Sequence, residues 1–179
     1  MRDHLEIPGG PGLSLRRWRA VDAGAVLTAF ADPLMAAQAV DPVDSLAAAE
    51  RWIAGHDARW ASDAAFAFAV VDDGGRGQVL GSVAVGAVDR RHATGWVSYW
   101  TTAEARGRGV ASAACRTVAD WAFADAGLFR LELGHRVDNP ASCRVATSAG
   151  FSMEGLERQK LQYDGVRYDV ELHARLATD

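Results

Sequence analysis

The sequence predicts an α+β fold in which helices pack on a mixed β-sheet. Stretches that alternate like strands or read as buried strands are interspersed with stretches whose apolar residues recur at helical spacing, in the order β, α, α, β, β, β, α, β, α, β, β. Three successive strands joined by short turns indicate an antiparallel meander, and one β-α-β crossover follows it. Strands and helices therefore do not alternate as they would in a repeating βα fold.

The N-terminal third precedes the meander. Residues 1–12 contain Pro8-Gly-Gly-Pro-Gly12 and are expected to form a tail or loop. Asp22 stands where it would cap a first helix, and Asp44 or Ser45 where it would cap a second. The elements expected here are a strand over 13–18, a helix over 23–31 and a helix over 45–60.

The remainder of the chain supplies most of the sheet. Residues 72–77 carry the turn signal of one hairpin, and Asp164-Gly165 that of another. The expected strands cover 65–71, 78–88, 95–100, 129–137, 151–163 and 166–176, and the expected helices cover 110–126 and a short stretch from Asn139 to Gly150.

Length and composition indicate one globular domain. The chain has 179 residues, 49% of them apolar and 23% charged, and no apolar run approaches the ~20 residues of a membrane span. The N-terminus lacks the apolar segment of a signal peptide, so a cytoplasmic location is expected. A net charge of −4 disfavours nucleic acid as a partner. Lys160 is the only lysine, and this preference for arginine is typical of a GC-rich bacterial genome.

Metal binding is not expected from the sequence. Cys115 and Cys143 form neither a disulfide framework nor a zinc pattern, and each falls in a predicted helix as a small apolar residue. The five histidines contain no HExxH motif and no close pair.

The segment Arg106-Gly-Arg-Gly-Val-Ala111 lies between a predicted strand and a predicted helix. Glycines allow successive backbone N–H groups to point into one concavity, and a helix N-terminus favours an anion there. Arg106 and Arg108 can add charge-assisted hydrogen bonds, so a pyrophosphate fits the segment. An ordinary glycine-rich turn and a dinucleotide-binding turn are alternative interpretations, whereas a Walker A loop lacks its Gly-Lys-Ser/Thr.

The same segment resembles the R/Q-x-x-G-x-G/A motif of the GNAT-type N-acetyltransferases, with Arg106, Gly109 and Ala111 at the signature positions. Further matches point to the RimJ/RimL type, the ribosomal-protein N-terminal acetyltransferases. These matches are Tyr99-Trp100, Arg136 to Ser142, Ala149-Gly-Phe151, Glu154-Gly155, and Asp164-Gly165 with Asp169. Their order and spacing extend from about Leu13 to Leu176.

This resemblance implies a splayed, mostly antiparallel sheet of six to seven strands with about four helices on both faces. It further implies that acetyl-CoA or another short acyl-CoA lies between the strands at 95–100 and 129–137. The cofactor-binding positions that it assigns are Trp100, Thr101, Thr102, Arg106, Gly107, Arg108, Gly109, Val110, Ala111 and Asn139. Ser142 occupies the position of a hydroxyl close to the thioester sulfur, and is the candidate catalytic residue. A homodimer is compatible with this branch.

The general base is not evident from the resemblance. Family members often carry glutamates at positions that are Trp96 and Leu161 in this chain. His135, Glu157 and Asp89 are candidate replacements. A backbone N–H at Trp100 or Thr101 is the candidate donor to the oxyanion.

The function expected from these observations is transfer of an acyl group from acyl-CoA to a primary amine of a protein N-terminus or a small molecule. Residues 1–179 would form a single domain for this reaction. A non-catalytic acyl-CoA sensor and a nucleotide-binding regulator remain as alternatives.

Overall fold

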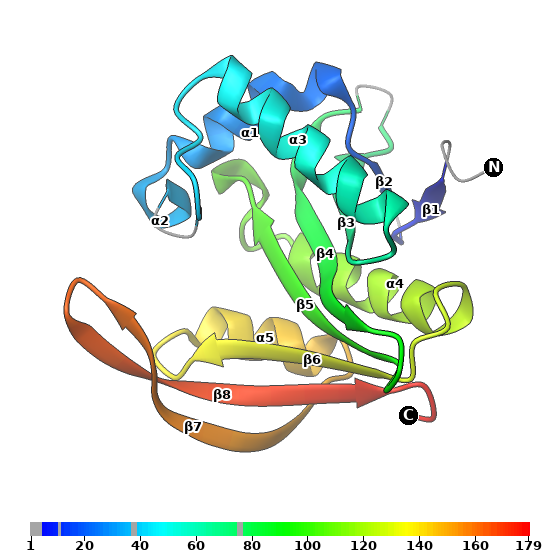
Figure 1. Cartoon of the computed structure of the whole chain (residues 1–179), viewed down its shortest axis with the longest axis vertical. Coiled ribbons are helices and arrows are strands. Elements are labelled where there is room, and N and C mark those ends of the chain that lie inside the picture. Colours follow the sequence, from blue (N-terminus) through cyan, green and yellow to red (C-terminus); the bar gives the residue numbers. More distant parts are fainter. Residues whose placement is uncertain (1–4, 11, 37–38, 75–76) are drawn as a thin grey trace.

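The computed structural model describes residues 5–10, 12–36, 39–74 and 77–179 (Figure 1). Its eight strands form one sheet in the order β1-β2-β3-β4-β5-β6-β8-β7. The strands are β1 (Glu6–Pro8), β2 (Leu13–Arg17), β3 (Phe66–Asp72), β4 (Val79–Asp89), β5 (Thr94–Thr101), β6 (Arg130–Arg136), β7 (Ser152–Tyr163) and β8 (Val166–Leu176). The α-helices are α1 (Ala23–Phe30), α2 (Pro33–Ala36), α3 (Leu46–Ala61), α4 (Val110–Ala124) and α5 (Pro140–Ser148), with single 3₁₀ turns η1 (Ala20–Asp22) and η2 (Ala103–Ala105).

The mixed, mostly antiparallel fold class is confirmed, with one strand more than expected. The additional strand is β1, which lies within the segment expected to be a tail or loop and pairs with β2 through Ile7 opposite Leu15. Three residues are too few to show alternation in the sequence. Helix α2 was missed for the same reason, because it is a single turn.

The predicted helix caps have different outcomes. Ser45 caps α3 as predicted, since its hydroxyl oxygen accepts a hydrogen bond from Ala48 N–H. The prediction for Asp22 is wrong, because its side chain makes no capping bond to α1. The Asp22 carboxylate instead accepts two bonds from the buried Arg16 guanidinium, at 2.7 and 2.8 Å, and one from Arg19 N–H. The Asp22 carboxylate therefore bonds the buried arginine instead of the N–H groups at the start of α1.

The two hairpins predicted from turn residues also differ in outcome. Asp164 and Gly165 both have positive φ angles, 48° and 79°, and join β7 to β8 as predicted. The turn predicted over 72–77 includes residues 75 and 76, which lie outside the described residues.

The sheet divides between β5 and β6. These are the two neighbours that run parallel, and their pairing extends only over Thr94–Trp96 opposite Arg130–Glu132. Farther along, β5 continues to Thr101 paired with β4, while β6 continues to Arg136 paired with β8. Figure 1 shows the two strands meeting at one end and diverging toward the other. The facing edges of the resulting opening carry backbone groups that no neighbouring strand pairs.

Helices cover the two parts of the sheet unequally. Phe66, Phe68 and Val70 of β3 face α4, whereas the alternating Ala67 and Ala69 face α1 and α3. Strand β3 is thus buried on both faces, while most of β7 is exposed. Among the described residues, no helix combines the length and hydropathy that crossing a bilayer requires.

Candidate active site

The loop from β5 to α4 forms a concave row of backbone groups. Gly107 and Gly109 have φ angles of +74° and +77°, the left-handed region that favours glycine. A Cβ atom added at either position would meet nothing within 4 Å, so the space in front of the loop is open. The first hydrogen bond of α4 joins Ala113 N–H to Gly109 C=O, which leaves the N–H groups of Val110 and Ala111 without helical acceptors. The geometry is that of an anion site at a helix N-terminus.

The two loop arginines occupy different surroundings. The Arg106 guanidinium donates a hydrogen bond to Asp32 at 2.6 Å, and so ties the loop to the segment between α1 and α2. Its backbone N–H is also engaged, since it donates to the carbonyl of Ala103. Arg108 is exposed. Of the two guanidinium groups predicted to assist an anion, Arg108 is therefore the one not held by Asp32.

Strand β5 forms one wall of the opening. A Cβ on Gly81 would lie 2.3 Å from the Trp100 carbonyl oxygen, so that carbonyl points toward β4. Thr102 N–H also points there, because it donates to Leu80 C=O. Backbone direction alternates along a strand, so the groups of Tyr99 and Thr101 face the opening. Of the two candidate oxyanion donors, Thr101 rather than Trp100 has the suitable direction.

Ser142 lies on α5, on the other side of the opening, and interacts with Tyr99. Burial raises the pKa of Tyr99 to about 12, and the nearby Ser142 side chain opposes this rise. The Tyr99 hydroxyl oxygen is buried and has no hydrogen-bond partner among the described residues. Two hydroxyl groups from opposite walls are thus near each other. The sequence contains no indication of a role for the Tyr99 hydroxyl.

The start of α5 fixes the position of Ser142. Pro140 stands in the first turn, and the Asn139 side-chain oxygen accepts a hydrogen bond from Ser142 N–H at 3.1 Å. Asn139 is therefore the N-cap of this helix. Its predicted contact with a cofactor stays a prediction, made from an exposed side chain beside the opening.

An aromatic ring lies where the family pattern suggests a carboxylate. The Trp96 indole lies against Gly134 of β6, where an added Cβ would approach it to 2.9 Å. Lys160 lies over this ring, with Nζ 5.4 Å from its centroid. Trp96 hence spans the point at which β5 and β6 separate. Leu161, at the second such position, lies in the β7–β8 hairpin opposite Tyr168.

The three candidate bases are positioned very differently. Asp89 accepts hydrogen bonds from the backbone of Arg91 and His92, and so stabilises the β4–β5 turn. Glu157 forms an ion pair with Lys160. His135 is buried on β6, with a ring nitrogen within 4.8 Å of the Cys143 sulfur. Cys143 directly follows Ser142, so His135 lies close to the start of α5.

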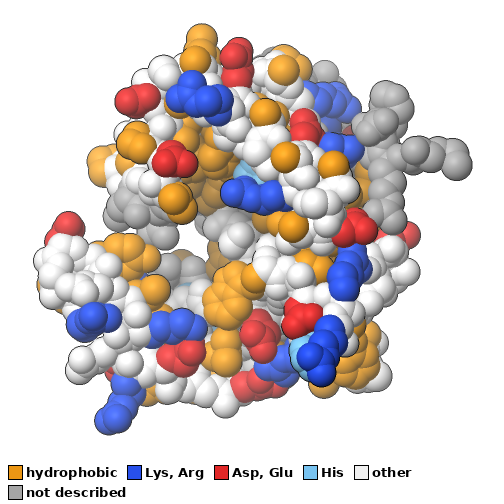
Figure 2. Space-filling model, viewed as in Figure 1, with side chains coloured by type: hydrophobic (Ala, Val, Ile, Leu, Met, Phe, Trp, Pro, Cys, Tyr) orange, Lys and Arg blue, Asp and Glu red, His pale blue; other side chains and the backbone are white. Residues whose placement is uncertain are grey.

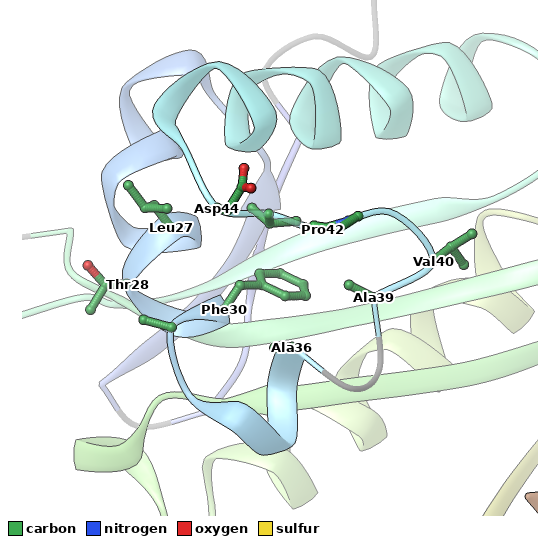
Figure 3. Close-up of a pocket in the computed structure, with 10 residues that line it drawn as sticks. Leu27, Thr28, Phe30, Ala36, Ala39, Val40, Pro42 and Asp44 are labelled. Atoms are coloured by element: carbon green, nitrogen blue, oxygen red, sulfur yellow. The ribbon is translucent and has the colours of Figure 1, made fainter. Parts of the chain in front are cut away.

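An apolar cavity of about 660 Å³ lies on the face of the sheet covered by α1 and α3. Figure 3 shows it between α1, α2 and the segment that leads into α3. Its lining residues are Leu27, Thr28, Phe30, Ala31, Ala36, Ala39, Val40, Pro42, Val43 and Asp44. The Phe30 ring lies 6.1 Å from that of Trp100, which connects this cavity to the end of β5. Figure 2, viewed as in Figure 1, shows a notch between the α1–α2 region and the β7–β8 hairpin.

Comparison with known proteins gives a consistent result. Residues 13–152 match the family model described as the acetyltransferase (GNAT) domain. YjcK of Bacillus subtilis (strain 168), a probable N-acetyltransferase, is 35% identical over 86 residues, which are 48% of this chain and 48% of YjcK. The ribosomal-protein-serine acetyltransferase of Escherichia coli (strain K12) is 28% identical over 99 residues, 55% of each chain. The chain spans about half the length of the curated relatives it matches.

Among solved structures, RimJ of Mycobacterium smegmatis in complex with a CoA-disulfide superimposes with a TM-score of 0.84 and 26% identity. The superposition covers 98% of this chain and 86% of RimJ. The family model covers well over half of the sequence, and its span includes β2 to α5 and the loop described above. The chain therefore belongs to the GNAT acetyltransferase family.

Proposed function

We propose that this protein is an N-acyltransferase that moves an acetyl or short acyl group from acyl-CoA to a primary amine. The observation that carries the proposal is the separation of β5 from β6 beside a loop whose left-handed glycines suit an anion. The unpaired edge of β5 suits the amide groups of a pantetheine arm, and the loop suits a pyrophosphate. The RimJ relative with its bound CoA-disulfide supports this assignment.

In this proposal the cofactor lies along Trp100 to Thr102, and its pyrophosphate meets the backbone from Gly107 to Ala111. Arg108 adds a charge-assisted hydrogen bond. Arg106 acts indirectly, because its ion pair with Asp32 holds the loop against the helices that border the acceptor side.

Acyl-CoA supplies the acyl group and a thiolate leaving group. The Thr101 N–H, directed into the opening, donates a hydrogen bond to the oxygen that gains negative charge when an amine attacks the thioester carbon. The Ser142 hydroxyl donates to the departing sulfur and transfers its proton there. Ser142 regains a proton from the attacking nitrogen, which loses one as the amide forms, and the Tyr99 hydroxyl, kept neutral by burial, orients Ser142.

The acceptor reaches this centre from the face opposite α4 and α5. That face carries Trp96, Trp100 and the cavity beside Phe30, and the notch of Figure 2 opens toward it. An α-amine has a pKa of ~8 against ~10.4 for a lysine side chain, so about 3 kcal/mol less is needed to deprotonate it at neutral pH. With Trp96 in the usual place of a carboxylate, an N-terminal α-amine is the favoured acceptor. The relative named a ribosomal-protein-serine acetyltransferase supports a protein as the acceptor.

Amine-dependent release of CoA tests the proposal. A thiol-reactive dye would follow CoA while acetyl-CoA is incubated with peptides of varied N-terminal residue, free amino acids and polyamines. We expect at least one amine to raise the rate well above background hydrolysis, with peptides above polyamines. If no amine does so while calorimetry still detects CoA binding, the protein is an acyl-CoA sensor, the alternative that Trp96 and Leu161 favour.

A further inference from the structure

Four side chains that commonly bind transition metals converge beneath α5. His135 comes from β6, Glu171 and His173 from β8, and Cys143 from α5, and one ligand atom of each lies within 4.8 Å of the others. His135 is 6% exposed and His173 is 1% exposed. Cys143 places the cluster next to Ser142 in the sequence, yet the proposed acyl transfer uses none of its four side chains.

The spacing of three ligand atoms fits one small ion. The Nε2 atoms of His135 and His173 are 3.0 Å apart, and a Glu171 carboxylate oxygen lies 3.4 Å from the first and 3.6 Å from the second. Tetrahedral zinc with bonds of 2.0–2.1 Å has ligand atoms about 3.3 Å apart. This triangle thus approximates one face of such a tetrahedron, and the Cys143 sulfur is available for the fourth corner.

The register of β6 and β8 builds this triangle. His135 pairs with Glu171, and Leu133 pairs with His173. Paired residues of an antiparallel sheet project from the same face, and alternate residues share it. His135, Glu171 and His173 therefore all lie on the face that α5 covers, where Cys143 joins them.

The two Nε2 atoms and the Glu171 carboxylate oxygen have too few protons among them to form a complete set of hydrogen bonds. His135 Nδ1 lies 3.0 Å from the carbonyl oxygen of Arg136, so this nitrogen carries the proton and Nε2 presents a lone pair. In a neutral pair, the only proton available between the two rings is on His173 Nε2, and it faces two acceptors. A backbone carbonyl that fixes the tautomer of a histidine in this way is typical of metal sites. With the His173 proton moved to Nδ1, which is buried without a hydrogen-bond partner among the described residues, a divalent ion would bind a lone pair of each of the three atoms.

We propose that His135, Cys143, Glu171 and His173 bind a divalent transition-metal ion, with zinc favoured by the mixed nitrogen, sulfur and oxygen ligands. A thiolate and a carboxylate balance the two positive charges, as a largely buried site requires. Four protein ligands leave no open position, so the ion has a structural role. It fastens the start of α5, which carries Ser142, to β6 and β8.

Cobalt spectroscopy tests this proposal without any measurement of acyl transfer. Chelator-treated protein would be titrated with Co²⁺, followed by displacement with Zn²⁺. We expect one equivalent of Co²⁺ to produce the intense visible bands of tetrahedral cobalt and a near-ultraviolet thiolate band. Saturation with Zn²⁺ at a hundred times its Kd should raise the Tm by about 5 to 10 °C.

Two cysteine variants provide a matched comparison. Cys143→Ser should abolish the thiolate band and weaken binding at least tenfold, while Cys115→Ser, at the buried free cysteine of α4, should leave the titration unchanged. Glu171→Gln should also weaken Co²⁺ binding, which provides a test should Cys143→Ser fail to fold. Binding weaker than about 10 μM, or a thiolate band that persists in Cys143→Ser, would overturn the proposal in favour of a metal-free histidine pair.

Discussion

The two sides of the opening between β5 and β6, its first and second walls, offer different chemical groups. The wall from β5 and its loop offers mainly backbone groups, from Tyr99, Thr101 and residues 107–111. The wall from β6, β8 and α5 offers side chains, including Ser142 and the histidine cluster. The first wall belongs to the part of the sheet with helices on both faces, whereas β7 at the far edge is largely exposed.

This difference separates two tasks. Backbone groups recognise the shape and charge that every acyl-CoA shares, and they need a rigid support and glycines at left-handed positions. Proton transfer needs hydroxyl or imidazole groups at defined places, which several elements must bring together. Variants that disturb the backbone of the first wall should therefore affect cofactor binding, and variants that remove a hydroxyl group used in proton transfer should affect turnover.

The largest effect is expected from Gly109→Asp. The substitution would place a carboxylate where the pyrophosphate meets the helix N-terminus, and like charges in contact cost several kcal/mol. We expect CoA affinity to fall about 1000-fold in calorimetry. Gly127→Asp is the matched control, because Gly127 has a φ of 67° and open space but ends α4 away from the loop. Equal losses in the two variants would attribute the effect to backbone strain.

Asp22→Asn should show how strongly the first wall is supported. Removal of one charge from a buried pair leaves the other uncompensated, so we expect the free energy of unfolding to fall by about 3 kcal/mol. Asp120→Asn is the comparison for the other half, since Asp120 is 58% exposed and bonds Arg175 of β8 at 2.7 Å. Its loss should cost less than about 1 kcal/mol in urea unfolding. Similar values for the two variants would contradict the difference in support.

The fold could be predicted largely because each long element carries its own periodicity. The meander, α4 and the Asp164-Gly165 hairpin depend on local patterns, and the structure places them within one or two residues of the prediction. The three-residue β1 and the single turn of α2 give no such pattern. Asp22 was misassigned because a distant arginine competes for it, which a local capping rule cannot include.

The site could be predicted only where it is made of contiguous backbone. The glycines of residues 106–111 predict an anion-binding loop, but nothing in the sequence predicts that Tyr99 and Ser142 are neighbours in the fold. The cluster of His135, Cys143, Glu171 and His173 was likewise hidden, because its spacings of 8, 28 and 2 residues match no motif. The β6–β8 register brings His135, Glu171 and His173 together, and α5 adds Cys143.

Ser142→Ala should separate turnover from binding on the second wall. A hydrogen bond to a charged group contributes about 1.5 to 3 kcal/mol, so loss of the hydroxyl should lower kcat about 10- to 100-fold with little change in the KM for acyl-CoA. Tyr99→Phe removes the hydroxyl that orients Ser142 from the first wall, and should have a smaller effect in the same direction. Ser148→Ala, on the last turn of the same helix, is the control for α5 itself. A KM that rises as much as kcat falls would assign Ser142 a structural role.

The smallest effect concerns His56 on α3, in the half that supports the first wall. Burial, and to a lesser extent Arg59, lowers the pKa of His56 to about 4, and both ring nitrogens are buried without hydrogen-bond partners among the described residues. Between pH 6.5 and pH 4, His56 is protonated in the unfolded chain but largely neutral in the folded chain. The free energy of unfolding therefore falls as the pH falls. Urea unfolding at pH 7 and pH 4.5 should show a loss of about 1 to 2 kcal/mol that His56→Phe abolishes, since phenylalanine keeps the edge contact with Trp52. His92→Gln, at an exposed turn, should retain the wild-type loss. If all three proteins lose stability in parallel, the acid sensitivity comes from elsewhere, and His56 does not distinguish the half of the sheet that supports the first wall.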